Sequence, residues 1–181
     1  MSATAEFIPV HVAVLTVSDT RTADTDTSGN LLTDSITSAG HEVVDKQIVA
    51  DDIYQIRAVV SRWVADPGVE AILVTGGTGF SGRDTTPEAV LPLFDKNIEG
   101  FGEVFRQISF NEIGTSTIQS RALGGLANNT VIFCMPGSTN ACRTAWNGII
   151  AQQLDATHKP CNYVKLITAR RLSGQDCESR G

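Results

Sequence analysis

The sequence predicts a single doubly wound α/β domain, with a mostly parallel sheet and helices on both of its faces. Nearly unbroken apolar runs over residues 10–17 and 69–75 are typical of strands that are covered on both faces. Amphipathic segments with helical spacing lie between these runs. The resulting β-α-β-α-β order with short connections favours right-handed crossovers, which place helices on both sides of the sheet.

The first half of the chain supplies the clearest elements. A strand is predicted over residues 10–17, and a polar loop follows it up to residue 27. Apolar positions at helical spacing then predict a helix over residues 28–39, which Gly40 ends as a left-handed stop. A second strand is expected over residues 42–49.

The next helix is predicted from a start signal and a stop signal. Asp52, followed three positions later by Gln55, resembles a helix N-terminus, and Pro67 with Gly68 marks the end. The third strand, over residues 69–75, follows directly.

Helices dominate the second half of the sequence. Thr86 as a cap and Pro87 at the first helical position predict a helix start, and a helix-rich stretch runs to about residue 113. A strand is predicted over residues 131–135. The last helix begins near Ser138 and Thr139, and either hydroxyl could cap it or help its N-terminus bind an anion. Its apolar stripe consists of Cys142, Ala145, Trp146, Ile149, Ile150 and Leu154.

Length and composition fit one globular domain. The chain has 181 residues, of which 41% are hydrophobic and 19% charged. We expect a flexible N-terminus over residues 1–9, the domain over residues 10–163, and a polar, disordered tail over residues 164–181.

Charge and cysteine content exclude several classes of protein. A net charge of −6 argues against a nucleic-acid binder, whose affinity depends on Lys and Arg. The four cysteines are irregularly spaced, which predicts reduced thiols and no zinc site, and the three histidines lack ligand spacing. No secretory signal is recognisable, and no apolar run approaches the ~20 residues of a membrane span. A cytoplasmic protein without membrane contact is therefore expected.

A glycine-rich loop over residues 75–79 is the strongest candidate site. Its three glycines and two threonines follow a buried strand, so backbone N–H groups could approach an anion without an intervening Cβ. The simpler alternative is that the glycines only permit tight turns. Gly77, Gly79 and Gly82 match G-x-G-x-x-G, but no helix opens on the match, and a P-loop lysine is missing.

Two acidic positions could complete such a site. Asp84 follows the glycine loop beside Arg83, and a carboxylate there suits Mg²⁺, which completes its shell with phosphates and water. Alternatively, Asp84 is a turn acceptor, and Glu88 is a first-turn charge favoured by the helix dipole. Asp51 and Asp52 end the second strand, where the sequence alone favours structural roles for both. In open α/β sheets the loops at Ser18, Asp51, Gly76 and Pro136 converge on one rim.

Together these segments resemble the molybdenum cofactor biosynthesis family of the MoaB/MogA type. The resemblance covers roughly residues 10–163 and rests on residues 18–21, residues 75–79, Asp84 with residues 86–88, and residues 136–139, in the family's order. Residues 99–122 and 141–146 resemble its B-type branch in particular.

The resemblance implies a molybdopterin-binding fold and an enzyme that adenylylates molybdopterin with Mg-ATP and releases pyrophosphate. Asp51 and Asp84 would then be the catalytic acids and Mg²⁺ ligands. The implied substrate-binding residues are Ser18, Asp19, Thr75, Gly76, Gly77, Thr78, Gly79, Ser120, Arg121, Pro136, Gly137 and Ser138. A homotrimer or homohexamer is also implied, and other proteins of cofactor biosynthesis are potential partners.

Two departures from the family pattern keep an alternative open. Ala50 stands where many relatives have proline, and Ser138-Thr139 replaces the Asn-Pro or Lys-Pro pair of the MogA branch. The alternative is an accessory protein that binds molybdopterin or a purine nucleotide without adenylyl transfer. Because both Asp51 and Asp84 are retained, an adenylyltransferase is the favoured prediction.

Overall fold

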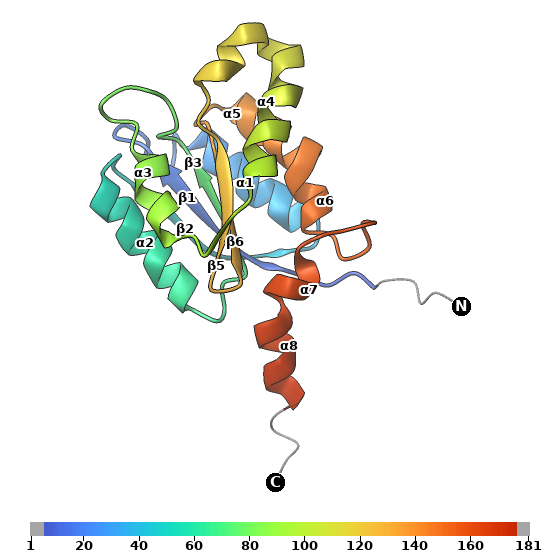
Figure 1. Cartoon of the computed structure of the whole chain (residues 1–181). Coiled ribbons are helices and arrows are strands. Elements are labelled where there is room, and N and C mark those ends of the chain that lie inside the picture. The colour runs from blue at the N-terminus through green and yellow to red at the C-terminus, as the bar shows by residue number, and fades with distance from the viewer. Residues whose placement is uncertain (1–5, 177–181) are drawn as a thin grey trace.

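The protein contains a six-stranded sheet between two layers of helices (Figure 1). The computed structural model describes residues 6–176. The strand order is β2-β1-β3-β6-β5-β4. The four parallel strands are β1 (His11–Val17), β2 (Glu42–Val49), β3 (Ala71–Thr75) and β6 (Thr130–Met135). All four were predicted within a residue or two of these bounds, and the predicted α/β class with a mostly parallel sheet is confirmed.

The other edge of the sheet is antiparallel. Strand β5 (Leu123–Ala127) pairs with β6, and the two-residue β4 (Lys96–Asn97) pairs with β5. Neither strand was predicted. Gly124 and Gly125 weaken the strand pattern of β5, because glycine has little intrinsic preference for extended structure. Packing explains why they are tolerated: a Cβ on Gly125 would lie 2.3 Å from the Phe94 ring.

One face of the sheet is covered by a large set of helices. These are α1 (Thr27–Ser38), α4 (Glu99–Ile113), α5 (Thr139–Ala145), η3 (Trp146–Ile150), α6 (Ala151–Gln153) and α7 (Val164–Ile167). Their apolar side chains form one core cluster with the sheet, which includes Leu32, Phe105 and Ile150. The predicted last helix is interrupted, because residues 146–150 form a wider π-helical turn within it. In Figure 1 α4 rises above the sheet and leads into η2 (Gly114–Gln119).

The opposite face carries fewer helices. Helix α2 (Ile53–Ala65) and α3 (Thr86–Val90) pack there, and a 3-10 turn, η1 (Leu91–Leu93), follows α3. Ile56, Val60 and Val90 belong to the core cluster on this side. Apolar residues on both faces bury the central strands, which is why these strands form continuous apolar runs in the sequence.

The predicted helix signals were mostly correct. Asp52 caps α2, since its Oδ1 accepts hydrogen bonds from the N–H groups of Tyr54 and Gln55 at 3.0 and 2.9 Å. Gly40 follows α1 with a φ of +86°. Thr86 was wrongly predicted as a cap: its hydroxyl instead donates to the carbonyl of Gly76 at 2.8 Å.

The C-terminal segment differs from the predicted disordered tail. Residues 164–176 form α7 and α8 (Ala169–Asp176), and Val164 and Ile167 are buried in the core. Arg171 donates to the buried carboxylate of Glu70 at 2.9 Å and to the carbonyl of Pro9 at 2.7 Å. No local pattern predicts this anchoring, because the partners of Arg171 lie 101 and 162 positions away along the chain. Residues 177–181 and 1–5 lie outside the described residues.

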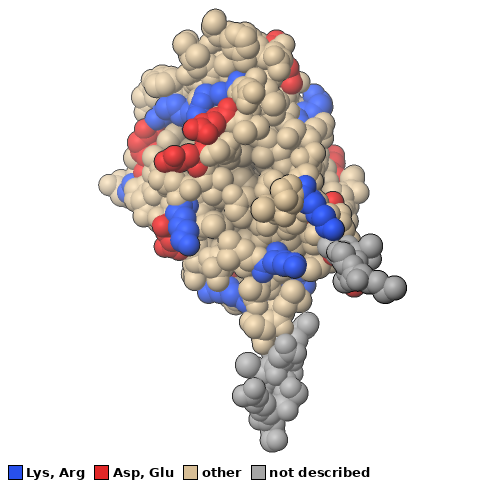
Figure 2. Space-filling view, turned by 45° about the vertical axis from the view of Figure 1, so that its right-hand side comes forward, with Lys and Arg blue, Asp and Glu red and all other residues tan. Residues whose placement is uncertain are grey.

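Acidic and basic side chains are interspersed over the face drawn in Figure 2, with broad uncharged areas between them. Among residues 6–176, no helix is long and apolar enough to cross a membrane.

Candidate functional site

A cleft of about 530 Å³ lies at the carboxyl ends of the parallel strands. This is the rim at which open α/β sheets bind their ligands. Every predicted site residue except Arg121 lines it, namely Ser18, Asp19, Asp51, Thr75, Gly76, Gly77, Thr78, Gly79, Asp84, Ser120, Pro136, Gly137 and Ser138. The structure therefore brings together segments that are up to 120 positions apart in the sequence.

The glycine loop needs its glycines for close packing and for backbone conformation. Gly76 has a φ of +103°, and a Cβ there would lie 2.2 Å from the carbonyl oxygen of Val17. Gly77 has a φ of +64°, and its Cβ would lie 2.7 Å from Oδ2 of Asp51. Only glycine adopts such conformations readily. The loop thus lies directly against one of the two predicted catalytic acids.

Two N–H groups of this loop are available to a ligand. The N–H of Gly76 is already used, since it donates to the carbonyl of Met135 at 3.0 Å. The N–H groups of Gly77 and Thr78 donate no hydrogen bond to any described residue. Consecutive free N–H groups in a loop form a concave site for an anion. Of the five residues of the glycine loop that were expected to bind an anion through their N–H groups, these two therefore remain.

Asp51 is held firmly and is only 8% exposed. Its Oδ1 accepts hydrogen bonds from the N–H of Thr85 at 2.9 Å and from the hydroxyl of Thr85 at 2.7 Å. Its Oδ2 accepts none from the described part of the chain. Asp52 takes the capping role, as described above, so Asp51 is the residue of the pair that faces the rim.

Asp84 is fixed by the turn in which it lies. Its Oδ2 accepts a hydrogen bond from the N–H of Ser81 at 2.8 Å. Hydrogen bonding from Ser81, with further help from the Gly79 N–H and the charge of Arg121, lowers the pKa of Asp84, although partial burial opposes the effect. Asp84 is thus a turn acceptor and at the same time an ionised carboxylate at the cleft.

An ion pair crosses the mouth of the cleft between Asp19 and Arg83. The Nε of Arg83 donates to Oδ2 of Asp19 at 2.9 Å, and Nη2 donates to Oδ1 at 2.6 Å. Hydrogen bonds from Arg83 and from the backbone of Asp51 lower the pKa of Asp19. Asp19 also fixes the end of β2, because its Oδ1 accepts the N–H of Asp51 at 3.1 Å.

Arg121 does not face the cleft. Its Nε donates to the carbonyl of Gly79 at 2.8 Å, Nη2 donates to the carbonyl of Asp84 at 2.7 Å, and Nη1 pairs with Glu88. The hydrogen bond from Arg121 also lowers the pKa of Glu88. Arg121 therefore joins the glycine loop to the segment around Asp84 and Glu88, and it does not line the cleft. Glu88 likewise is bound to this arginine and does not line the cleft.

Two of the hydroxyl groups that were predicted to bind substrate have structural roles. Thr75 is fully buried, and its hydroxyl donates to the carbonyl of Pro136 at 3.1 Å. The Ser138 hydroxyl caps α5 by accepting the N–H of Ala141 at 3.1 Å. The cap role predicted for Ser138 is thus confirmed, and an additional contact with an anion stays a prediction.

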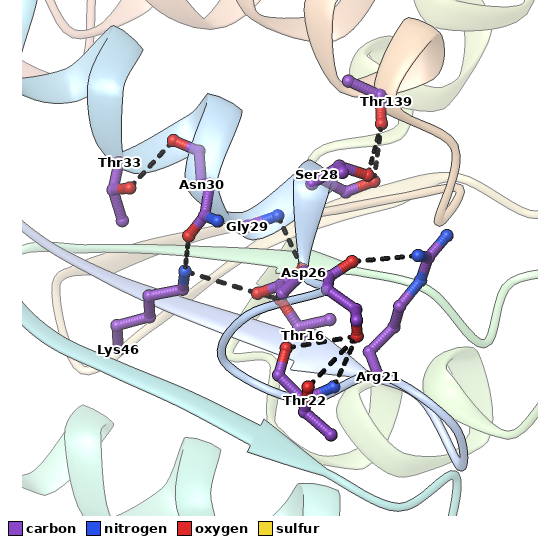
Figure 3. A network of polar contacts seen from close by, with 12 residues as sticks. Thr16, Arg21, Thr22, Asp26, Ser28, Gly29, Asn30, Thr33, Lys46 and Thr139 are labelled. Carbon is purple, nitrogen blue, oxygen red and sulfur yellow. Dashed lines mark hydrogen bonds and ion pairs between the residues drawn. The ribbon is translucent and has the colours of Figure 1, made fainter.

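Asp26 was not predicted as a site residue, yet it lines the cleft although it is only 1% exposed. Figure 3 shows this carboxylate at the centre of a polar network. Its Oδ1 caps α1 through the N–H of Gly29 at 2.9 Å, and its Oδ2 accepts the hydroxyl of Thr16 at 2.8 Å. The Nζ of Lys46 lies 3.4 Å from the same Oδ2. An Asp just before a predicted helix was the one signal that could have revealed it.

The first turn of α1 is tied to the loop after β6. The hydroxyl of Ser28 donates to the carbonyl of Gly137 at 2.7 Å, and Thr27 and Thr139 share a hydrogen bond of 2.9 Å. A Cβ on Gly137 would lie 3.2 Å from the Cα of Gly76, so this loop also rests on the glycine loop. Residues from α4 and η2, namely Ile113, Ser116 and Gln119, complete the wall, and no sequence pattern marks them.

None of the three described thiols lines the cleft, although the Sγ of Cys142 lies 3.1 Å from the hydroxyl of Thr75. Cys134, Cys142 and Cys161 are free, as expected, but Cys161 is exposed. Burial raises the pKa of the Cys142 thiol to about 11. Cys177 lies outside the described residues.

A cleft lined by loops at the carboxyl ends of a doubly wound, mostly parallel sheet is the arrangement of an α/β ligand-binding domain. Residues 13–156 match the protein family described as "Probable molybdopterin binding domain", and the chain belongs to this family.

Several relatives are similar to this chain over most of its length. It is 61% identical over 158 residues to molybdenum cofactor biosynthesis protein B of Escherichia coli K12, a match that covers 87% of this chain and 93% of that protein. A crystal structure of a molybdenum cofactor biosynthesis protein B superposes with a TM-score of 0.81 at 41% identity, covering 91% of this chain and 98% of the other. The tungsten cofactor synthesizing protein MoaB of Pyrococcus furiosus gives a TM-score of 0.72 at 34% identity, over 80% and 92% of the two chains.

Proposed function

We propose that this chain acts in molybdenum cofactor biosynthesis as a molybdopterin adenylyltransferase. In this reaction the terminal phosphate of molybdopterin attacks the α-phosphorus of ATP. A new P–O bond forms, the bond between the α- and β-phosphates breaks, and pyrophosphate leaves. The observation that carries the proposal is the juxtaposition of Asp51, Asp84 and the free N–H groups of Gly77 and Thr78 in one cleft.

The two carboxylates fit a magnesium ion. The Oδ2 of Asp51 accepts no hydrogen bond from the described residues, and the turn around Ser81 keeps Asp84 ionised. No group of three or more His, Cys, Asp or Glu side chains within residues 6–176 is arranged to hold a metal. This donor set suits an ion that takes one or two carboxylates and completes its shell with substrate phosphates and water. Magnesium would neutralise charge on the phosphates of ATP as the adenylyl group is transferred.

The protein's own groups would mainly position the substrates. The N–H groups of Gly77 and Thr78 would bind phosphate oxygens, and the walls formed by the β1 and β6 loops would orient the pterin. Holding two anions in line is the demanding part of phosphoryl transfer, so positioning and electrostatic stabilisation account for most of the catalysis. We also propose that the chain functions as a homotrimer or homohexamer, which light scattering of the purified protein would measure.

The test is an assay of pyrophosphate release with molybdopterin, Mg²⁺ and ATP. We expect Asp84→Asn to lower turnover by roughly 100-fold or more, the scale for losing a principal electrostatic stabiliser. Asp34→Asn, at an exposed position on α1, is the matched control and should retain full turnover.

Two results would argue against this function. Unchanged pyrophosphate release by Asp84→Asn would refute the proposed metal role. Binding of molybdopterin or a purine nucleotide without any pyrophosphate formed would instead support an accessory protein of the same pathway.

A further inference from the structure

The charges that line the cleft are poorly matched to a phosphorylated ligand. Four carboxylates and two guanidinium groups line it among the described residues, and the carboxylates belong to Asp19, Asp26, Asp51 and Asp84. An entering anion therefore meets an excess of negative charge. Phosphate binding in this cleft therefore depends on a guanidinium that can leave its present partner and bind the ligand. Arg binds phosphate through two parallel hydrogen bonds.

The two arginines of the cleft differ in what they contact. Arg21 donates to a backbone carbonyl, that of Thr25, at 2.9 Å. Arg83 makes both of its hydrogen bonds to one carboxylate, that of Asp19, and its Nη1 donates to no described residue. The Arg83 side chain is 64% exposed and that of Asp19 is 38% exposed. Exposed ion pairs contribute little to stability, so this pair can be exchanged easily.

We propose that Arg83 is a phosphate-binding residue of the cleft, and that Asp19 occupies its guanidinium in the free protein until a ligand phosphate displaces the carboxylate. The inference rests on the proposed function only for the class of ligand, a phosphate anion. A phosphate group presents the same pair of acceptor oxygens as a carboxylate but carries up to twice the charge. It therefore displaces Asp19, whereas a singly charged carboxylate ligand does not.

The exchange does not require the loops to separate. After Arg83 leaves, the Oδ1 of Asp19 still accepts the N–H of Asp51 at 3.1 Å, which keeps the β1 loop attached to the end of β2. The Nη2 of Arg83 and the N–H of Asp51 both donate to Oδ1 of Asp19, at 2.6 and 3.1 Å, so a phosphate that takes the place of Asp19 on the guanidinium lies close to Asp51. Asp19 thereby tunes the affinity for phosphate without forming part of the transfer step.

The experiment is a double-mutant cycle on the binding of inorganic pyrophosphate, measured by calorimetry in magnesium-free buffer. Arg83→Gln should weaken binding roughly tenfold, as expected for the loss of a charged hydrogen-bond donor. Asp19→Asn should tighten binding about threefold or more, because Arg83 is then free. In the Arg83→Gln background, Asp19→Asn should no longer tighten binding. Asp24→Asn, which removes an exposed charge from the same loop outside the cleft, is the matched control and should bind like the unsubstituted chain.

Two results would overturn the proposal. One is that Asp19→Asn tightens binding equally in both backgrounds. That result would show that the lost negative charge of Asp19 favours the anion without any release of Arg83. The other is weaker binding by Asp19→Asn together with a lower unfolding temperature, since that would make the ion pair purely structural.

A parallel series with ATP identifies the source of the phosphate. Equal coupling would place a nucleotide phosphate on Arg83, and no coupling would place the molybdopterin phosphate there. Calorimetry needs no turnover, so a chain that binds pyrophosphate through Arg83 but releases none from ATP would refute the adenylyltransferase and leave this exchange supported. The reverse result would refute the exchange alone.

Discussion

Thr85 donates two hydrogen bonds to a single oxygen of Asp51, one from its backbone N–H at 2.9 Å and one from its hydroxyl at 2.7 Å. The two residues are 34 positions apart, at the end of β2 and just before α3. Because both bonds go to Oδ1, they fix the carboxylate plane and leave Oδ2 for a ligand. Thr85 thus sets the orientation of the proposed magnesium ligand without touching substrate.

Replacing Thr85 by valine tests this orientation. Thr85→Val retains the side-chain shape and the backbone N–H but removes the hydroxyl, so we expect pyrophosphate release to fall roughly tenfold, the scale of a lost hydrogen bond to a charged group. Thr85→Ser keeps the hydroxyl and should stay within about twofold of the unsubstituted chain by the same argument. Titration of Mg²⁺ in the assay should show that the valine variant needs more metal. Equal magnesium dependence in both variants would contradict a positioning role.

The glycine loop provides a matched pair for stability. Gly76→Ala places a Cβ 2.2 Å from the Val17 carbonyl oxygen at a φ of +103°, so the backbone must shift. We expect a loss of about 3 kcal/mol or more in the free energy of unfolding. A Cβ on Gly82, a few residues away, meets nothing within 4 Å, so Gly82→Ala should change stability by less than about 1 kcal/mol. Urea denaturation of both variants measures the contrast, and similar losses in both would show that the loop relaxes freely.

His41 predicts a dependence of stability on pH. Its Nδ1 accepts the N–H of Val10 at 3.2 Å, and burial lowers the pKa of its imidazole, although attraction to Asp155 opposes this. The unfolded chain, with an imidazole pKa of about 6.5, therefore takes up the proton more readily than the folded chain. Stability from this group is complete above that pH and is lost as the pH falls through the lowered pKa of the folded protein.

The corresponding variant is His41→Gln, which retains an acceptor but does not titrate. The free energy of unfolding, measured in urea at pH 5 and at pH 7.5, should fall less on acidification in this variant than in the unsubstituted chain. An identical fall in both proteins would assign the acid sensitivity to other groups.

Neighbouring leucines on α1 test the packing of the larger core cluster. Leu32 is fully buried, whereas Leu31 packs against the same cluster from a partly exposed position. Leu32→Ala should cost about 2–5 kcal/mol, since it leaves a cavity that the surroundings fill only in part. Leu31→Ala should cost about 1 kcal/mol, because water can reach the vacated space. Thermal unfolding ranks the two, and the opposite order would show that the helix is rotated about its axis.

Most of the fold follows from local pattern, and what escapes prediction depends on distant contacts. The buried parallel strands have a continuous apolar signature, so β1, β2 and β3 were found with nearly their observed limits. Strand β5 was missed because Gly124 and Gly125 make sense only beside the Phe94 and Phe101 side chains that fill their space. The helices at the C-terminus were missed for a similar reason, since Arg171 finds its partner Glu70 101 positions earlier.

The site shows the same division. Converging loops were predictable because the carboxyl ends of parallel strands meet at one rim, and Asp84 was recognisable from its place after the glycine loop. Asp51 was not distinguishable from Asp52 by sequence physics alone, and the family resemblance supplied the choice. The direction of a long side chain was also beyond prediction. Arg121 was expected to bind substrate, yet its guanidinium donates to the carbonyls of Gly79 and Asp84 and does not line the cleft.

The contacts of Arg171 bear on how the polypeptide could be rearranged. One guanidinium group joins the carbonyl of Pro9, just before β1, to the carboxylate of Glu70, just before β3. Pro9 and Arg171, which lie near the two ends of the described chain, are therefore in contact at the amino ends of the strands, at the opposite end of the sheet from the cleft. A linker that joins the chain near Pro9 to the chain near Arg171 would permit circular permutation, with new termini in an exposed connection away from the cleft.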